Sequence, residues 1–431
     1  MKIGLNDSKS WMAVISLAYA ISFISIYVYY IHKYFAYAGY NIEDNSYVYM
    51  AISLIISLTP ILFFKSLGKI SDFASLLIYI FGYIPTILSI QLLCKAQLTT
   101  VLYQLAIMVG MMMFFRASVN KESLLSSIKP SFSIGLLNII TIIFTLVLIN
   151  KFLGRMSFVS FDEVYEHRSS NTEYGLGFVG YIIMWLTYTF YPFYLSYGMF
   201  YKKVIYIIAG IVGHVIIYMC TASKASLLMP LILFGVYIIL NLKRKSFFVV
   251  LTIILIAFSQ AILLWVDNPI VFIIASVFLI RTLSMAGLLS AQYLTFFLEH
   301  PYTNYAHINF INYITGAYPY GDTPLGIAVG NFFMPYYDET SPIVNANAGF
   351  WATDGIAANG LLGILIVNII VYYLLKLLNN VTLNKQLLFT SVFFTPSILA
   401  LLNVSIFTTL LSCGLIFNIF IMLKMKLPNQ I

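Results

Sequence analysis

Residues 247–265 read FFVVLTIILIAFSQAILLW, and no charged side chain interrupts them. A helix of this length is roughly 28 Å long, close to the roughly 30 Å of a bilayer's hydrocarbon core. The basic residues Lys243, Arg244 and Lys245 come just before it, as is typical of the cytoplasmic end of a spanning helix. The stretch therefore predicts a transmembrane helix.

The rest of the chain repeats this pattern. Of its 431 residues, 61% are hydrophobic and 9% charged, with a mean hydropathy of +0.93, whereas soluble domains carry roughly 25% charged residues. Lipid offers no partner for backbone polar groups, so each apolar run must be helical. The sequence predicts an all-α polytopic membrane protein, a single transmembrane domain (1–431) with about twelve transmembrane helices. The runs lie near 11–31, 47–64, 74–93, 98–115, 133–150, 176–200, 204–221, 226–242, 247–265, 350–375, 387–403 and 405–423.

The distribution of charge predicts the orientation. With the N-terminus in the cytoplasm, 16 of the 23 Lys and Arg residues fall on the cytoplasmic side and 12 of the 15 acidic residues fall outside. This follows the positive-inside rule, so both termini are predicted to be cytoplasmic. The first run lacks a small-residue cleavage site and is predicted to be a retained helix rather than a signal peptide. The net charge of +8 then reflects topology rather than a nucleic-acid surface. The three cysteines have no metal-ligand spacing.

Two external loops stand out, at 151–175 and at 266–349. A loop as long as the second is usually functional. Its first part, up to about residue 300, predicts one or two short helices that lie at the outer interface or re-enter the membrane. Its second part is rich in Tyr, Asn, Gly and Pro, a composition that suits hydroxyl-rich ligands such as sugars. Tyr also marks the lipid headgroup region, which is the alternative explanation.

Three external cations are candidate anion ligands. Arg281 follows an almost continuous apolar run, so it needs an anion such as phosphate, or it extends to lipid headgroups. Lys224 stands at the start of a helix, where backbone amides also attract anions, or it is an ordinary interfacial lysine. Arg168 lies among acidic residues, so ion pairing is its default role and ligand binding its second.

Residues 345–365 read NANAGFWATDGIAANGLLGIL and place an ionisable residue at the start of an apolar run. On a helix beginning near Gly349, helical spacing puts Asn347, Trp351 and Asp354 on one side. We expect Asp354 to face a wet cavity with Trp351 beneath it. Three roles are open for this carboxylate: a general base, an ion-pair partner of Arg281, or a solvated helix end.

The layout and three stretches resemble the O-antigen polymerases of the Wzy type, within the superfamily of O-antigen ligases and polymerases. The stretches are TASKASLLMP (221–230), IRTLSMAG (280–287) and the segment 345–365. The resemblance implies a GT-C-like fold in the bacterial inner membrane. It also implies glycosyl block transfer between undecaprenyl-pyrophosphate-linked repeat units at the periplasmic face, with a Wzz-like chain-length regulator as a possible partner and no nucleic acid.

This chain departs from the ligase branch, which usually has Arg where Lys224 stands and a His where Asn345 and Asn347 stand. His300 and His307 lie in the large loop, away from the matching place. A ligase that transfers glycan to lipid A core is therefore the second hypothesis. A lipid-linked oligosaccharide flippase is the third, although it should place charges deep in the membrane and show inverted repeats.

The chemistry of block transfer then assigns roles to the candidates. Asp354 and Arg281 are the predicted catalytic residues, and fixed cations with no acidic pair at ligand spacing predict a metal-independent enzyme without a cofactor. The predicted substrate-binding residues are Lys224, Arg168, Asn345, Asn347, Trp351 and His307. His214 lies in the middle of an apolar run and is expected to be a buried hydrogen bonder between helices.

Overall fold

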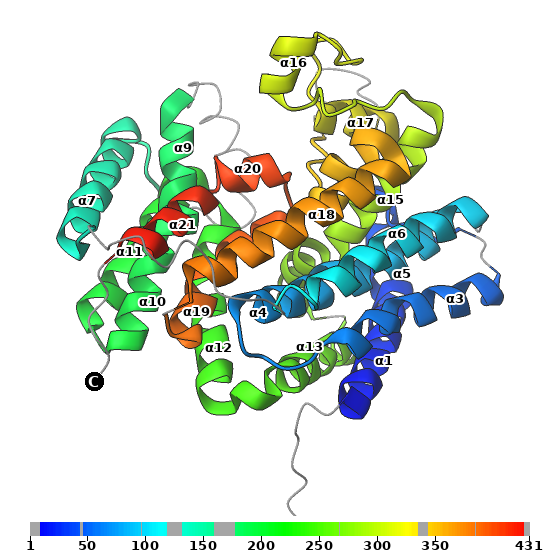
Figure 1. Ribbon diagram of the computed structural model, residues 1–431, viewed down its shortest axis with the longest axis horizontal. Helices are drawn as coiled ribbons and strands as arrows, with labels where there is room; N and C mark the ends of the chain where they lie inside the picture. The colour runs from blue at the N-terminus through cyan, green and yellow to red at the C-terminus, as the bar shows by residue number, and fades with distance from the viewer. Residues whose placement is uncertain are drawn as a thin grey trace, which may run out of the picture. The chain divides into compact units, whose positions relative to one another are not determined.

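The described residues form helices joined by turns and irregular segments, with no β-strand among them (Figure 1). Apolar runs without charges leave helix formation as the way to pair their backbone groups. The computed structural model describes residues 9–43, 46–95, 97–118, 132–158, 177–266, 268–334, 344–383 and 385–425.

Eight helical segments in these ranges are long and apolar enough to cross a membrane, which confirms a polytopic membrane protein. They are Lys9–Ala38, Ile70–Leu93, Ile134–Lys151, Gly177–Tyr201, Val204–Thr221, Lys224–Leu264, Pro269–Glu299 and Trp351–Val381. Four shorter apolar helices are Tyr47–Phe63, Leu98–Phe114, Leu387–Leu401 and Leu415–Lys424. Each of the twelve predicted runs is helical over most of its length, and the number of crossings stays a prediction.

Residues Pro269–Glu299 differ from the prediction. They form one continuous helical segment of 31 residues, made of α14 (Pro269–Ala275), a π-helical stretch (Ser276–Ser284) and α15 (Met285–Glu299). The expectation of helices too short to span is therefore corrected, because Arg281 in the interior of the segment does not interrupt the helix. If this segment crossed the membrane in addition to the twelve predicted runs, the N- and C-termini would lie on opposite sides. The cytoplasmic location of both termini therefore stays a prediction.

The chain packs as two compact units, whereas a single domain is expected from the sequence. Unit 1 comprises residues up to Asn120, Lys243–Lys376 and Leu401–Ile406; unit 2 comprises Lys121–Leu242, Leu377–Ala400 and Phe407 onwards.

In unit 1, α1 (Lys9–Ile26) packs along α13 (Phe247–Leu264), and α15 packs along α5 (Ile84–Leu93). The Gln260 Nε2 atom donates to the Ser22 hydroxyl over 2.8 Å. Unit 1 also contains α3 (Tyr47–Leu58), α4 (Ile70–Leu77), α6 (Leu98–Phe114), α16 (Asn309–Thr315) and α17 (Leu325–Phe333).

In unit 2, α10 (Tyr191–Tyr201) and α11 (Val204–Thr221) form a tight pair whose turn has Lys202 at a φ of 56°. Gly210 and Gly213 allow the side chains of Leu195 and Tyr191 to approach the α11 backbone. The unit also contains α7 (Ile134–Lys151), α9 (Gly177–Trp185), α12 (Lys224–Lys243), α19 (Leu387–Leu401) and α21 (Leu415–Lys424).

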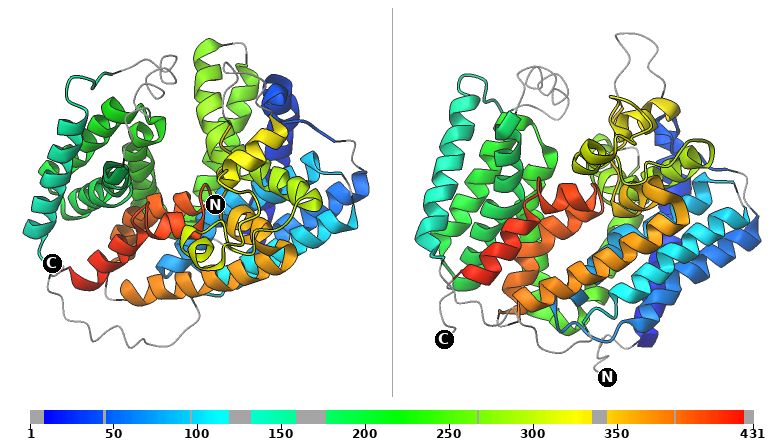
Figure 2. Two further views of the ribbon diagram at one scale, coloured as in Figure 1. Left: turned by 90° about the horizontal axis from the view of Figure 1, so that it is seen from above. Right: turned by 45° about the horizontal axis from the view of Figure 1, so that its top comes forward.

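A break in α18 (Ala357–Val381) shapes the region around Asp354. A π-helical stretch, Trp351–Ile356, leads into α18, and the backbone leaves helical geometry at Asn359 and Gly360. Gly360 has a φ of 55° and a ψ of −131°, a combination that is readily available only to glycine. In Figure 2, α15, α17 and the first part of α18 lie close together, as the contacts of α15 with α17 and with Trp351–Ile356 require.

Candidate functional site

The broken helix holds a loop segment against Asp354. The carbonyls of Ala357 and Ala358 accept from the backbone N–H groups of Thr303 and Asn304 over 2.8 and 2.9 Å. The Asn359 side-chain amide also donates to the Asn304 side-chain oxygen over 3.2 Å. Carbonyls beside a helix break need new partners, and here residues 303–304 supply them. The loop after α15 is thereby fixed to the start of α18.

Asp354 is buried, with 2% of its surface exposed. Its Oδ2 atom accepts from the Ile406 N–H over 2.7 Å, and its Oδ1 atom lies 3.6 Å from His307 Nε2. Both side chains are enclosed, at 3% and 5% exposed for Asp354 and His307. Of the three roles open to Asp354, the solvated helix end is therefore wrong. Within the described ranges the basic side chain beside it is His307, and Arg281 makes no ion pair with it.

The hydrogen bonds of Thr303 determine which nitrogen of His307 carries a proton. The Thr303 hydroxyl lies 3.0 Å from the Ala357 carbonyl and 2.8 Å from His307 Nδ1. It has one proton, and the carbonyl can only accept. The Nδ1 atom must then be the donor, which leaves Nε2 with a lone pair in the neutral ring. His307 Nε2 faces Asp354 Oδ1. A proton or a bound hydroxyl group between these two atoms would give each of them a hydrogen-bond partner.

Three buried polar atoms in this region have no hydrogen-bond partner in the described part of the chain. They are the Tyr305 hydroxyl, His307 Nε2 and Asp354 Oδ1. Buried polar groups are nearly always paired in folded proteins, so each exception calls for an explanation. A ligand with a hydroxyl group would supply the missing partners. We call Tyr305, His307 and Asp354 the unpaired triad.

Arg281 lies elsewhere in unit 1, exposed on the π-helical stretch Ser276–Ser284. Burial raises the pKa of Tyr40, and the positive charge of Arg281 opposes that rise. The Tyr40 hydroxyl is buried and has no partner among the described residues. The predicted pairing of Arg281 with Asp354 is wrong within the described residues, while its predicted role in anion binding stays open.

The other predicted cations belong to unit 2. Lys224 is the first residue of α12, as its sequence position suggests. Arg168 falls outside the described residues, as does most of the predicted loop 151–175. The convergence of Lys224 and Arg168 with Asp354 therefore stays a prediction.

Asn345 and Asn347 are exposed and alternate with buried Ala346 and Ala348, in a segment that belongs to no helix. Their side-chain oxygens lie against Gly326 of α17, and the Ala346 N–H donates to the Gly326 carbonyl over 2.8 Å. The two asparagines therefore remain available to a ligand at one edge of the segment.

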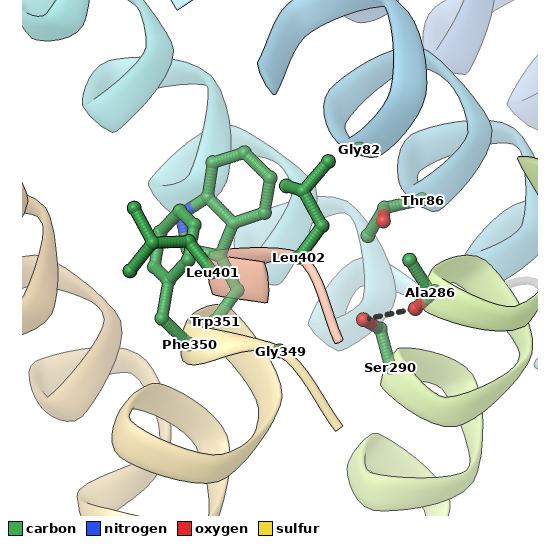
Figure 3. A pocket seen from close by; sticks show the side chains of 9 residues that line it. All are labelled: Gly82, Thr86, Ala286, Ser290, Gly349, Phe350, Trp351, Leu401 and Leu402. Atoms are coloured by element: carbon green, nitrogen blue, oxygen red, sulfur yellow. Dashed lines mark hydrogen bonds between the residues drawn. The ribbon is translucent and has the colours of Figure 1, made fainter. Parts of the chain in front are cut away.

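Trp351 is 4% exposed, and its indole N–H donates to Asn368 Oδ1 over 2.9 Å. Its ring stacks with Phe114 at a centroid separation of 6.2 Å. A cavity of about 10 Å³ beside it is also lined by Thr86 and Ser290 (Figure 3), and this volume admits about one water molecule. Trp351 is thus a core residue rather than a sugar platform, which corrects its predicted contact with substrate.

Two further histidines, His300 and His214, have different surroundings. His300 Nδ1 lies 2.9 Å from the Phe296 carbonyl, and its ring stacks on the Phe296 ring at 4.0 Å, so its role is structural. His214 is fully buried beside Tyr191, but both of its ring nitrogens lack hydrogen-bond partners in the described residues. The expectation that His214 bonds between helices is therefore wrong there.

No group of three or more His, Cys, Asp or Glu side chains within the described ranges is arranged to hold a metal ion. Tyr305 and Thr303 are not among the site residues that the sequence predicts. Only the general richness of the loop in polar and aromatic residues pointed to them.

Comparisons with family models, with curated proteins and with solved structures find no match for this chain.

Proposed function

We propose that this protein polymerises undecaprenyl-pyrophosphate-linked oligosaccharide repeat units by glycosyl block transfer, at the periplasmic face of the bacterial inner membrane. One observation carries the proposal. The segment that resembles the O-antigen polymerases brings a buried carboxylate to a histidine whose facing nitrogen has no partner in the described residues. Such a pair is suited to take a proton from a sugar hydroxyl.

The proposed step conserves atoms and charge. The acceptor hydroxyl gives its proton to His307 Nε2 as its oxygen bonds to the anomeric carbon of the donor sugar. The bond from that carbon to the pyrophosphate oxygen breaks, and undecaprenyl pyrophosphate leaves with the electron pair. Asp354, expected from the sequence to be the base itself, then stabilises the imidazolium through its charge at 3.6 Å.

The negative charge that develops on the leaving pyrophosphate needs cations. Arg281 is the strongest candidate in unit 1, because it is exposed on a helical segment rich in apolar residues and makes no ion pair within the described ranges. Lys224 and Arg168 are the further candidates. In this proposal they contact the lipid-linked diphosphate, while Asn345 and Asn347 contact sugar hydroxyls.

Arg281→Ala is expected to lower polymer formation by roughly 10²-fold or more, because a preorganised charge at the leaving group is lost. Arg281→Lys is expected to restore it poorly, since an ammonium cannot bind two phosphate oxygens in the fork geometry of a guanidinium. Lys33→Ala is a matched control, because Lys33 is also exposed in unit 1 and lies over the Tyr34 ring. Equal polymer from the Arg281 and Lys33 variants would remove Arg281 from the mechanism.

Polymer formation by the purified protein is expected to continue at its full rate after complete chelation with EDTA. Protein cations would supply the charge stabilisation that a divalent ion supplies in many sugar transferases. The measurement is chain length on gels against time, with and without EDTA. Loss of activity that added Mg²⁺ or Mn²⁺ restores would contradict metal independence.

A ligase is the second candidate function, and a specific observation favours it. The closing segment of the ligase branch usually presents a His, which is absent from residues 345–349 here, but the fold brings His307 to Asp354. That contact supplies an imidazole from another part of the chain. The absence of a His from residues 345–349 therefore no longer argues against a ligase. Lys224 in place of the usual Arg remains as the other difference from that branch.

A deletion strain distinguishes the candidates. Loss of a polymerase should leave single repeat units on the lipid A core. Loss of a ligase should leave the core bare while long lipid-linked polymer accumulates. A flippase would instead move labelled lipid-linked oligosaccharide across proteoliposomes without a change in glycan length, and that result would reject both transferase proposals.

A further inference from the structure

The segment that carries the unpaired triad has an unusual backbone. Asn304 and Tyr305 are consecutive and have φ values of 46° and 66°. Asn tolerates the left-handed region, but a bulky aromatic residue seldom occupies it. The hydrogen bond from the Asn304 N–H to the Ala358 carbonyl, 2.9 Å long, holds this conformation. Strain of this kind concentrates where function requires a particular side-chain position.

The Tyr305 hydroxyl differs from the other tyrosine hydroxyls near it. It is buried and has no partner in the described ranges, although a buried Tyr hydroxyl usually finds one. Four neighbours do have partners. The hydroxyls of Tyr293, Tyr318 and Tyr320 donate to the carbonyls of Ala346, Thr323 and Pro301, and that of Tyr302 lies 3.3 Å from the Tyr103 hydroxyl.

The chemical capacities of the triad are complementary. Burial first, and then the charge of Asp354, raise the pKa of Tyr305, so the phenol keeps its proton and can donate. His307 Nε2 and Asp354 Oδ1 both face inward as acceptors. The site thus offers one donor beside two acceptors. Two adjacent hydroxyl groups of a sugar match this set, because one can give its proton while the other accepts a hydrogen bond.

We infer that Tyr305 is a positioning residue that donates a hydrogen bond to the acceptor sugar, at the oxygen next to the hydroxyl that reacts. A donor on the reacting oxygen itself would withdraw the electron density that attack requires. The neighbouring oxygen is therefore the better partner. This inference rests on the proposed function for the identity of the reacting hydroxyl, and it names the ligand class as a sugar with two adjacent oxygen substituents.

Tyr305→Phe tests the inference, because it removes the hydroxyl and keeps the ring. The free oligosaccharide of one repeat unit, released from its lipid, is titrated into the purified full-length protein by calorimetry. Polymerisation of the lipid-linked unit is measured in parallel. We expect oligosaccharide binding to weaken by about tenfold or more and the apparent KM to rise by a similar factor, the size expected for one lost hydrogen bond. The melting temperature should stay the same or rise, because an unpaired buried hydroxyl has been removed.

Tyr293→Phe is the matched control. Its hydroxyl is buried but bonded to the Ala346 carbonyl over 3.0 Å, so its loss should lower the melting temperature. Unchanged binding in Tyr305→Phe, or a melting temperature that falls as far as in Tyr293→Phe, would overturn the inference. Weakened binding without polymer from the wild type would reject the proposed function alone. Polymer from the wild type with unchanged Tyr305→Phe binding would reject the inference alone.

Discussion

Asp354→Asn is expected to lower the rate of polymer formation by about 10²- to 10⁴-fold, because the charge that stabilises the protonated form of the base, His307, is lost. The amide keeps an oxygen that can accept from the Ile406 N–H, now 2.7 Å from Oδ2, so the local fold should persist. It lacks the negative charge that would stabilise protonated His307. The measurement is the initial rate of chain growth from purified lipid-linked repeat units, with protein amount and melting temperature recorded beside it.

Asp72→Asn is the matched control for this prediction. Asp72 is also buried in unit 1, and its Oδ2 accepts from the backbone N–H groups of Gly68 and Lys69 over 3.0 and 2.8 Å. It is not paired with a histidine in the described residues. Polymer formation should survive Asp72→Asn. Wild-type polymer from Asp354→Asn, or equal losses from both variants, would take Asp354 out of the chemistry.

A second variant tests whether Asp354 and His307 act as one unit. If a single proton transfer needs both side chains, removal of either should cost nearly the whole effect. We therefore expect the double variant Asp354→Asn with His307→Ala to be about as slow as the slower single variant. Additive losses would show that the two residues serve separate steps.

Part of this arrangement could be read from the sequence, because an ionisable residue at the start of an apolar run is costly unless it has a function. Asp354 was identified on that ground, and it is buried. That His307 lies beside Asp354 could not be predicted. The hydrogen bonds that bring His307 to Asp354 join Thr303 to Ala357 across 54 residues, through a loop with no repeating pattern.

The predicted contact of Trp351 with substrate was wrong because partners far along the chain enclose its ring, Phe114 by stacking and Asn368 by a hydrogen bond. Helical spacing in the sequence gives the face of a side chain but not what packs against that face. The short-helix prediction for Pro269–Glu299 failed for a different reason. One arginine and several small polar residues resemble a loop in composition, yet a helix accommodates them without interruption.

The break in α18 depends on Gly360, whose φ of 55° and ψ of −131° are readily available only to glycine. Gly360→Ala is expected to lower the free energy of unfolding by about 3 kcal/mol, from backbone strain and crowding together. A Cβ atom there would lie 2.7 and 2.8 Å from the hydroxyls of Tyr302 and Tyr103. Because the helix break would shift, the carbonyls of Ala357 and Ala358 would lose their loop partners and His307 would move away from Asp354. Polymer formation should therefore fall to background.

Gly316→Ala separates strain from crowding in this prediction. Gly316 also has a positive φ, 57°, but a Cβ atom there would meet nothing within 4 Å. Its substitution should cost only about 1 to 2 kcal/mol, for the left-handed backbone, and should leave polymer formation intact. The melting temperatures of the two variants and their polymer yields are the measurements. If Gly360→Ala melts no lower than Gly316→Ala and still makes polymer, the break in α18 does not position His307, since the loop would remain docked without it.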